Sequence, residues 1–179
     1  MRAIPLLLIC LAACAGSAGG PAPEPDRESV RIVDTGGAVQ MTTYRSEGWV
    51  TRELTASVDA LWSVLPAVHD SLGIPVTRRD AARHTIGNDG LRVRTRLGKV
   101  GLQRYLDCGS TQGGPSAESY EVYLIVSTQV LPGEVTGSRL STSVQAQARP
   151  VNFAADWIRC TSKNTLEKAI ADLAGRLAR

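Results

Sequence analysis

The chain has 179 residues, a formal net charge of +3 and four cysteines. A charge balance this weak argues neither for nor against an anionic partner. The length suits one ordinary domain with its own core. The sequence contains no internal repeat and, after its first residues, no apolar run long enough to span a membrane.

The first fourteen residues have the layout of a secretory signal. Arg2 supplies a positive charge, residues 4–12 form a short apolar core, and small residues lead into Cys14. Because the core is too short to span a bilayer, we expect residues 1–13 to be a signal peptide and not a permanent anchor. The ending Leu11-Ala12-Ala13-Cys14 resembles the lipobox of bacterial lipoproteins. That resemblance implies that Cys14 carries diacylglycerol and becomes the first residue of the mature protein.

The same resemblance implies a location. A lipoprotein is exported and anchored to a bacterial membrane by its lipid, and nucleic acid is not an expected partner there. Ala15 stands where lipoproteins retained in the inner membrane of well-studied diderm bacteria carry Asp, so we expect the outer membrane, facing the periplasm. Residues 15–28 are rich in Gly, Pro and Ala, and we expect a lipidated, flexible tether over residues 14–41. Residues 42–179 then form the domain.

Two cysteines remain for the folded domain. Cys10 leaves with the signal, and Cys14 is consumed by lipid. Cys108 and Cys160 are an even pair in an oxidising compartment, which predicts a disulfide. It would close a loop worth about 4 kcal/mol of stability in the chain-entropy model. The alternative is two free buried thiols. Neither cysteine has a second Cys or His at metal-ligand spacing, so a metal site is not expected.

Apolar periodicity predicts two helices. The first follows Ser57, a good N-cap, and ends at Gly73 and Pro75. Pro66 lies inside it and is expected to kink or split it. The second begins around residues 161–164, with polar residues on one side and apolar residues on the other. Its expected polar side carries Glu167, Lys168, Asp172 and Arg176, and its apolar side carries Leu166, Ala169, Ile170, Leu173, Ala174 and Leu177.

Several strands are expected between and before these helices. Residues 91–97 alternate strictly between apolar and polar side chains, which predicts one strand. Residues 98–101 are expected to turn the chain back, and residues 102–108 to form the returning strand. Residues 109–117 are rich in Gly, Ser and Pro and predict a loop. Residues 41–54 contain another strand.

The clearest β-hairpin covers residues 120–149, with its turn at Pro132-Gly133-Glu134. Alternate residues on both strands are apolar, which indicates an antiparallel sheet with one buried and one wet face. The expected buried face carries Tyr120, Val122, Leu124, Val126, Thr128, Val130, Leu140, Thr142, Val144, Ala146 and Ala148.

These elements predict a two-layer α+β domain, with an antiparallel sheet packed against two helices. The order β-α-β-β-β-β-α looks like the helix-grip arrangement. Residues 57–80, followed by Ile86-Gly87, resemble the repeated domain of the helix-grip lipoproteins that belong to the outer-membrane β-barrel assembly machinery. In that family a Trp-bearing helix ends in Gly-hydrophobic-x-Val, before an acidic residue and a glycine that opens a strand. The resemblance implies a helix-grip fold and a role in envelope assembly.

Little in the sequence suggests catalysis. Neither histidine, His69 or His84, accompanies a Ser or Cys nucleophile signature. We interpret His69 as a residue at the edge of the apolar stripe of the first helix, and His84 as a loop residue. The chain has no Gly-rich phosphate loop and no His-Glu-x-x-His motif. We therefore expect no enzyme activity, no catalytic residue, no cofactor and no metal site.

One charged pattern has geometric content. Arg92, Arg94 and Arg96 alternate along the strand predicted over residues 91–97, which places all three on one face, about 7 Å apart. The functional interpretation is a contact face for anionic groups such as lipid headgroup phosphates. The alternative is a solvated face whose arginines pair with acidic residues on the next strand.

The tryptophans allow a similar choice. Trp49, Trp62 and Trp157 are expected to pack in the core or at its edge, and the alternative is an aromatic cluster that holds a ligand.

These features together predict a lipid-anchored cell-envelope protein that acts as a non-catalytic binding or assembly module. Its partners are the membrane, through the lipid on Cys14, and an envelope protein or lipid. The alternative is a carrier of a small apolar ligand, in a cavity between the sheet and the C-terminal helix. Ala146 and Ala148 are small and leave room for such a cavity.

Overall fold

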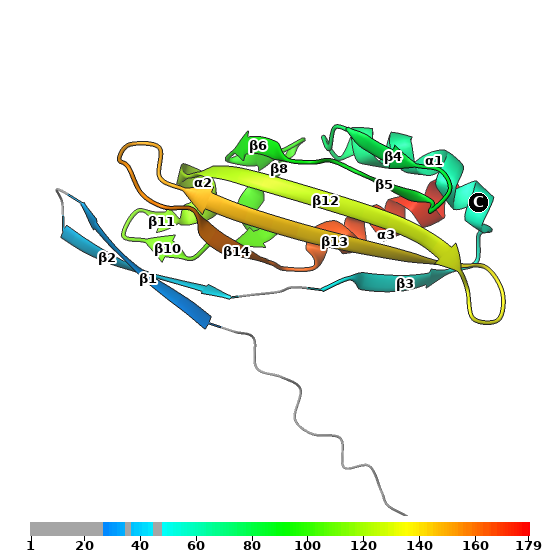
Figure 1. Ribbon diagram of the computed structural model, residues 1–179, viewed down its shortest axis with the longest axis horizontal. Coiled ribbons are helices and arrows are strands. Elements are labelled where there is room, and N and C mark those ends of the chain that lie inside the picture. Colours follow the sequence, from blue (N-terminus) through cyan, green and yellow to red (C-terminus); the bar gives the residue numbers. More distant parts are fainter. Residues whose placement is uncertain (1–26, 35–36, 45–47) are drawn as a thin grey trace, which may run out of the picture.

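The computed structural model describes residues 27–34, 37–44 and 48–179 of the chain. The signal peptide, the lipidation at Cys14 and the first part of the predicted tether lie outside these residues. Within the described part, the fold is α+β, as predicted. An eight-stranded antiparallel sheet carries the two longer helices on one face (Figure 1).

Two long strands form the centre of the sheet. β12 (Glu121–Pro132) and β13 (Ser138–Arg149) pair along their whole length, with Glu121 opposite Arg149 and Pro132 opposite Ser138. Shorter strands flank them on both sides. Those on the β12 side are β6 (Leu91–Arg94), β5 (Thr85–Gly87) and β4 (Arg78–Asp80); those on the β13 side are β3 (Val50–Leu54), β14 (Ile158–Ser162) and β9 (Leu106–Asp107).

The alternation predicted for this hairpin is confirmed. Every residue expected on its inner face is buried, from Tyr120 to Ala148. The outer face is wet over much of its area, but Ser141 is also buried. Its hydroxyl lies 2.8 Å from the Thr51 hydroxyl on β3, because these two residues are paired in register.

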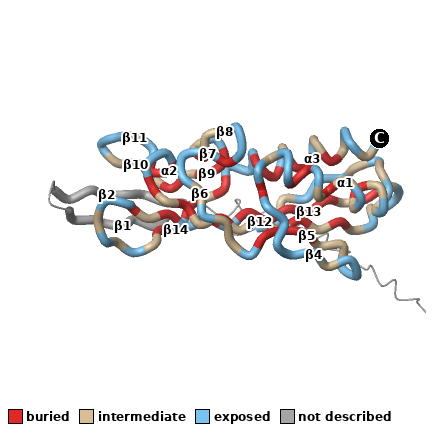
Figure 2. The backbone as a smooth tube through the Cα atoms, turned by 90° about the horizontal axis from the view of Figure 1, so that it is seen from above, coloured by how far each residue is buried: buried red, intermediate tan, exposed pale blue. Residues whose placement is uncertain are grey.

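The helices α1 (Val58–Ser71) and α3 (Thr165–Leu177) cover the inner face, and buried residues concentrate where they meet the sheet (Figures 1 and 2). The Ser57 side chain caps α1, accepting a hydrogen bond from the Ala60 backbone N–H at 3.2 Å. α1 runs through Pro66 without interruption, so the expected split does not occur. Packing of the buried Leu61 and Leu65 on the sheet compensates for the hydrogen bond that proline cannot donate.

The strand predicted over residues 91–97 is wrong in its second half. The chain leaves β6 at Thr95, whose φ of +60° lies in the left-handed region. β7 (Arg96–Leu97) then pairs with β8 (Val100–Gly101) in a separate two-stranded sheet. A β-branched residue with positive φ breaks the alternation that an extended strand requires.

The segment after β8 also differs from the prediction. Residues 102–108 form a short 3-10 helix (Leu102–Arg104) and β9, which pairs with β14 and not with β6. The predicted loop over residues 109–117 contains the small hairpin β10 (Ser110–Thr111) and β11 (Gly114–Pro115) and enters the short helix α2 (Ser116–Ser119).

Two regions of strand structure were not expected. Part of the predicted tether, residues 14–41, lies in the antiparallel hairpin of β1 (Arg27–Asp34) and β2 (Gly37–Tyr44), so the tether prediction is wrong there. Val, Ile and Thr are frequent over this part of the sequence, and they favour strands. β14 was also missed, and it delays the last helix to Thr165.

Candidate functional site

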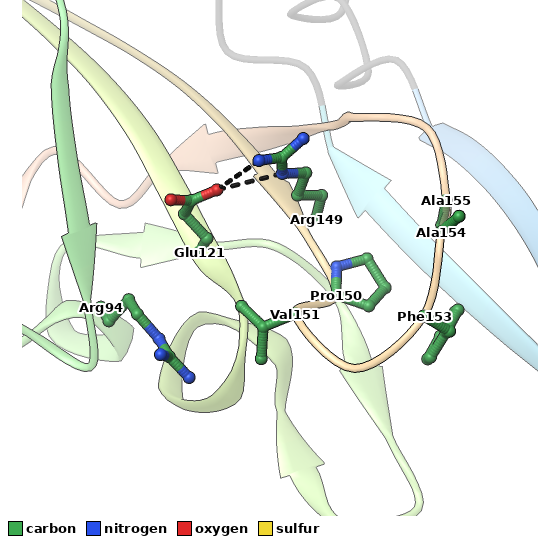
Figure 3. A pocket seen from close by; sticks show the side chains of 8 residues that line it. All are labelled: Arg94, Glu121, Arg149, Pro150, Val151, Phe153, Ala154 and Ala155. Atoms are coloured by element: carbon green, nitrogen blue, oxygen red, sulfur yellow. Dashed lines mark hydrogen bonds and ion pairs between the residues drawn. The ribbon is translucent and has the colours of Figure 1, made fainter.

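A pocket of about 430 Å³ opens at the end of the β12–β13 hairpin, on the side where β6 joins β12. The strands contribute charged side chains, and the connection from β13 to β14 contributes apolar ones (Figure 3). The lining residues are Arg94, Glu121, Arg149, Pro150, Val151, Phe153, Ala154 and Ala155.

The charged side of the pocket centres on Glu121. Arg149 is its partner in the β12–β13 register, and the Arg149 Nε and Nη2 atoms donate to the same Glu121 carboxylate oxygen at 3.0 and 2.8 Å. The other oxygen lies 3.8 Å from an Arg92 guanidinium nitrogen. Because the Glu121 side chain is only 20% exposed, its bonds to Arg149 are sheltered from competition with water.

Aromatic side chains hold the same arginine from another direction. The Arg149 guanidinium carbon lies 4.6 Å from the centroid of the Trp157 ring, a cation–π contact. Trp157 in turn meets Tyr123 edge-to-face, with ring centroids 6.3 Å apart. Trp157 therefore belongs to a cluster beside the pocket, whereas Trp49 is exposed.

Arg94 differs from its neighbours. It lies opposite Glu121 in the β6–β12 register, yet within the described residues its guanidinium forms no hydrogen bond or ion pair. Arg92, Arg94 and Arg149 thus surround a single carboxylate, which leaves an excess of two positive charges. This arrangement attracts anions.

Arg96 does not share this face. Because Thr95 turns the chain, Arg96 lies on β7, and its Nη2 atom donates to the Lys99 carbonyl oxygen at 2.6 Å. The predicted face of three arginines is therefore wrong for Arg96. Only Arg92 and Arg94 belong to it.

Glu121, Arg149 and the connection after them were not among the site residues predicted from the sequence. Counting outward from the predicted turn at residues 132–134 pairs residue 121 with residue 149, so the register of the hairpin was the signal available. The apolar wall directly follows the predicted strand, and in Figure 3 Val151 lies between Arg94 and Phe153. Val151 is 42% exposed, so part of this wall faces solvent.

His69 is not at the edge of the apolar stripe, as predicted, but fully buried. Its Nε2 atom lies 3.1 Å from the Thr128 hydroxyl, which lies 3.3 Å from the Thr142 hydroxyl. Both threonines point inward at positions where an apolar residue would be expected, so they supply polar partners inside the core. Burial lowers the pKa of His69 to about 4. His69 is a neutral structural residue without access to solvent.

His84 lies in the turn before β5 with a φ of +47°. Its ring meets the Trp62 ring edge-to-face at 5.5 Å, and the Arg79 guanidinium carbon lies 4.7 Å from the Trp62 ring centroid. This small cluster holds the end of β4 against α1.

Glu167 is not on the solvated side of the last helix, as predicted. It is 2% exposed and accepts a hydrogen bond from the Ser162 hydroxyl at 2.6 Å. Ser162 also accepts from the Asn164 backbone N–H at 3.1 Å, so the pair organises the entry into α3. Burial raises the pKa of the Glu167 carboxyl.

Cys108 and Cys160 form the predicted disulfide, with an S–S distance of 2.04 Å and Cα atoms 4.2 Å apart. The bond ties the residue after β9 to β14, and not to the last helix as expected. Both cysteines are buried.

A second hollow, of about 240 Å³, lies where the β3–α1 connection meets the C-terminal half of α3. Leu54, Ala56, Ala171 and Gly175 line it, together with three polar residues. It lies at the rim of the helix layer, away from the fully buried Ala148.

Among the residues the structure describes, no group of three or more His, Cys, Asp or Glu side chains is placed to hold a metal ion. No helix in the same part of the chain is long and apolar enough to cross a membrane. Comparisons of the sequence with protein-family models and with curated proteins each found no match.

Proposed function

We propose that this protein is a lipid-anchored cell-envelope protein that acts as a non-catalytic binding or assembly module. The lipid on Cys14 holds it at the outer membrane, facing the periplasm. The domain then contacts an envelope component through the pocket that Arg94 lines. The observation that carries this proposal is the arrangement of three arginines around one carboxylate, beside a partly exposed apolar wall.

The chemistry of the pocket supports binding without catalysis. Its ionisable groups are Arg94 and the ion-paired Glu121 and Arg149. Arginine is always protonated and serves poorly as a general base, and the one carboxylate already accepts two hydrogen bonds. Both histidines lie elsewhere, and His69 is fully buried. What these groups do well is hold an anion with fixed donors.

The envelope part of the proposal is supported by the sequence. The Leu11-Ala12-Ala13-Cys14 ending resembles a lipobox, and residues 57–80 resemble part of the helix-grip lipoproteins of the outer-membrane β-barrel assembly machinery. In the structure these latter residues contribute α1 and β4, which place the helix layer and one edge of the sheet. A role in assembly through the opposite face of the sheet is compatible with that placement.

The second candidate function is a carrier of a small apolar ligand, and the 240 Å³ hollow beside α3 is the observation that favours it. Large side chains occupy the centre of the inner layer, where Leu61, Leu124 and Ile170 are fully buried. A carrier needs an enclosed apolar cavity of several hundred cubic ångströms. We therefore place the carrier second.

The test has two parts, both in the bacterium that makes the protein. Mass spectrometry of the mature N-terminus is expected to find a lipid-modified Cys14, and the Cys14→Ser variant is expected to leave the membrane fraction or to remain unprocessed. An unmodified N-terminal residue other than Cys14 would contradict the proposal.

The second part compares cross-linked partners of three forms: wild type, the double variant Arg92→Gln/Arg94→Gln, and Arg83→Gln. Arg83 is a matched control, because it is exposed and pairs only weakly with Asp80, at 3.9 Å. A partner that wild type and Arg83→Gln retain and the double variant loses supports a contact through this face. A partner retained equally by all three forms contradicts it. An apolar ligand extracted in stoichiometric amount would favour the carrier.

A further inference from the structure

We infer that the pocket lined by Arg94 binds an anionic phospholipid, with the phosphate on Arg94 and the adjoining glycerol and acyl carbons on the wall formed by residues 150–155. This inference rests on the proposed function and deepens it, because it names the class of ligand that the pocket takes.

Arg94 retains a charge that no neighbour neutralises. Its cross-strand neighbour, Glu121, is taken by two hydrogen bonds from Arg149 at 2.8 and 3.0 Å and lies 3.8 Å from Arg92. Within the described residues, all guanidinium donors of Arg94 remain uncommitted. A phosphodiester carries one negative charge and accepts bidentate hydrogen bonds from one guanidinium. The number of free donors therefore matches a single phosphodiester.

The pocket is held in place before a ligand arrives. Arg94 lies on β6, whose backbone pairs with β12. Arg149 is fixed both by Glu121 and by the Trp157 ring, 4.6 Å from its guanidinium carbon. Binding an anion here orders few side chains, which keeps the entropic cost of binding low.

The apolar wall indicates that the ligand is more than a free anion. Pro150, Val151, Phe153, Ala154 and Ala155 line the side of the pocket away from the strands. Free phosphate would leave this wall exposed to water, and the 430 Å³ volume far exceeds what phosphate fills. An amphipathic anion covers both the guanidinium and the apolar wall, and an anionic phospholipid is the form of such a molecule found at a membrane surface.

An acidic protein segment fits the pocket less well. Several carboxylates in a row would meet only one uncompensated guanidinium and would be repelled by Glu121. A zwitterionic phospholipid carries a cationic headgroup into a region with two excess positive charges, which opposes its binding. These comparisons leave a phospholipid with one net negative charge as the best match.

The test uses short-chain lipids that stay monomeric, so that the lipid anchor does not confuse the result. The full chain carries Cys14→Ser, and dihexanoyl-phosphatidylglycerol is titrated into it at low salt by calorimetry. Saturable one-to-one binding is expected. Arg94→Gln is expected to weaken it about tenfold or more, and Val151→Ser to weaken it by a smaller factor. The control Arg83→Gln, on the β4–β5 connection at the other end of the sheet (Figure 1), is expected to bind as the parent does.

Three further probes identify the source of the anion. Glycerol 3-phosphate, dihexanoyl-phosphatidylcholine and hexanoate are each expected to bind at least several-fold more weakly than dihexanoyl-phosphatidylglycerol. Equal affinity for glycerol 3-phosphate would show that the apolar wall contributes nothing, and equal affinity for hexanoate or phosphatidylcholine would show that an anionic phosphodiester is not what the pocket selects. Each of these results overturns the inference, as does unchanged binding by Arg94→Gln with a native circular dichroism spectrum.

Failure here is separable from failure of the proposed function. A protein with a lipid-modified Cys14 and a partner that depends on Arg92 and Arg94, but no affinity for the short-chain lipid, overturns only this inference. A protein that binds the lipid at Arg94 but carries an unmodified N-terminus keeps the inference and overturns the envelope anchor.

Discussion

Arg94 and Glu121 lie opposite each other across β6 and β12, yet their side chains form no ion pair. Glu121 instead bonds Arg149 on the other side of β12, at 2.8 Å. One carboxylate between two flanking strands can serve the arginine with the better geometry, and the two hydrogen bonds and the stacking on Trp157 favour Arg149. The uncommitted donors of Arg94 are a consequence of that competition.

The bond between Glu121 and Arg149 is expected to contribute to stability as well as to the site. Glu121→Gln removes the charge-assisted acceptor and leaves three arginines uncompensated, so we expect the free energy of unfolding to fall by about 1 kcal/mol. Urea denaturation measures this. The control Glu134→Gln removes a well-exposed carboxylate, 3.5 Å from Arg139, and is expected to change little. Equal losses in both variants would contradict the prediction.

The Cys108–Cys160 disulfide closes a loop with a sequence separation of 52 residues. Replacing both cysteines by serine is expected to lower the free energy of unfolding by as much as about 4 kcal/mol, because the unfolded chain regains the freedom that the cross-link removes. Urea denaturation of the double variant and the wild type measures the difference. Peptide mapping without reduction is expected to yield one fragment that joins the two cysteines. Recovery of two separate alkylated peptides would show free thiols instead.

The burial of His69 predicts a dependence of stability on pH. Its pKa is lowered to about 4 in the folded state, from 6.5 in the unfolded chain, so below pH 6.5 the unfolded state binds the extra proton. Stability is therefore expected to fall as the pH decreases from about 6.5 to about 4, by up to about 3 kcal/mol. Urea denaturation across this range is expected to show a shallower decline for His69→Gln. His84→Gln is the matched control and should keep the wild-type slope; a slope unchanged by His69→Gln contradicts the assignment.

Glu167 has the opposite linkage. Burial raises the pKa of its carboxyl, so the folded state favours the protonated form, and the associated stability is lost as the pH rises through the folded pKa. Glu167→Gln keeps the shape and stays neutral. We expect this variant to gain stability relative to the wild type between about pH 5 and about pH 8, measured by urea denaturation. A relative loss over the same interval would mean that the ionised carboxylate is favoured in the core.

Thr95 adopts a φ of +60°, which costs a β-branched residue more than it costs glycine. Thr95→Gly is expected to raise the free energy of unfolding by up to about 1 kcal/mol, because relief of this strain exceeds the added freedom of the unfolded chain. Thr136→Gly, in the exposed β12–β13 turn and without a positive φ, is the control and is expected to be neutral or destabilising. A loss of stability in both variants would show that Thr95 is not strained.

Local patterns in the chain were enough to predict the α+β class, the long hairpin and the pairing of two cysteines. Alternation along residues 120–149 identified the buried face because each strand is long and unbroken, so a period of two persists. The apolar stripe of residues 58–72 identified α1 because its helical period also persists over several turns. Cys108 and Cys160 were paired because the other two cysteines were assigned to the signal and the lipid.

The make-up of the site depended on contacts between distant segments. Arg96 left the arginine face because one residue, Thr95, takes a backbone conformation that alternation does not report. Thr128 gave His69 a polar partner in the core, although the two are far apart in the chain. Arg94 kept its donors free only because Arg149, on another strand, had already bound Glu121. Side-chain patterns describe local periodicity, whereas the competition among distant charged groups is set by the register and packing of the folded strands.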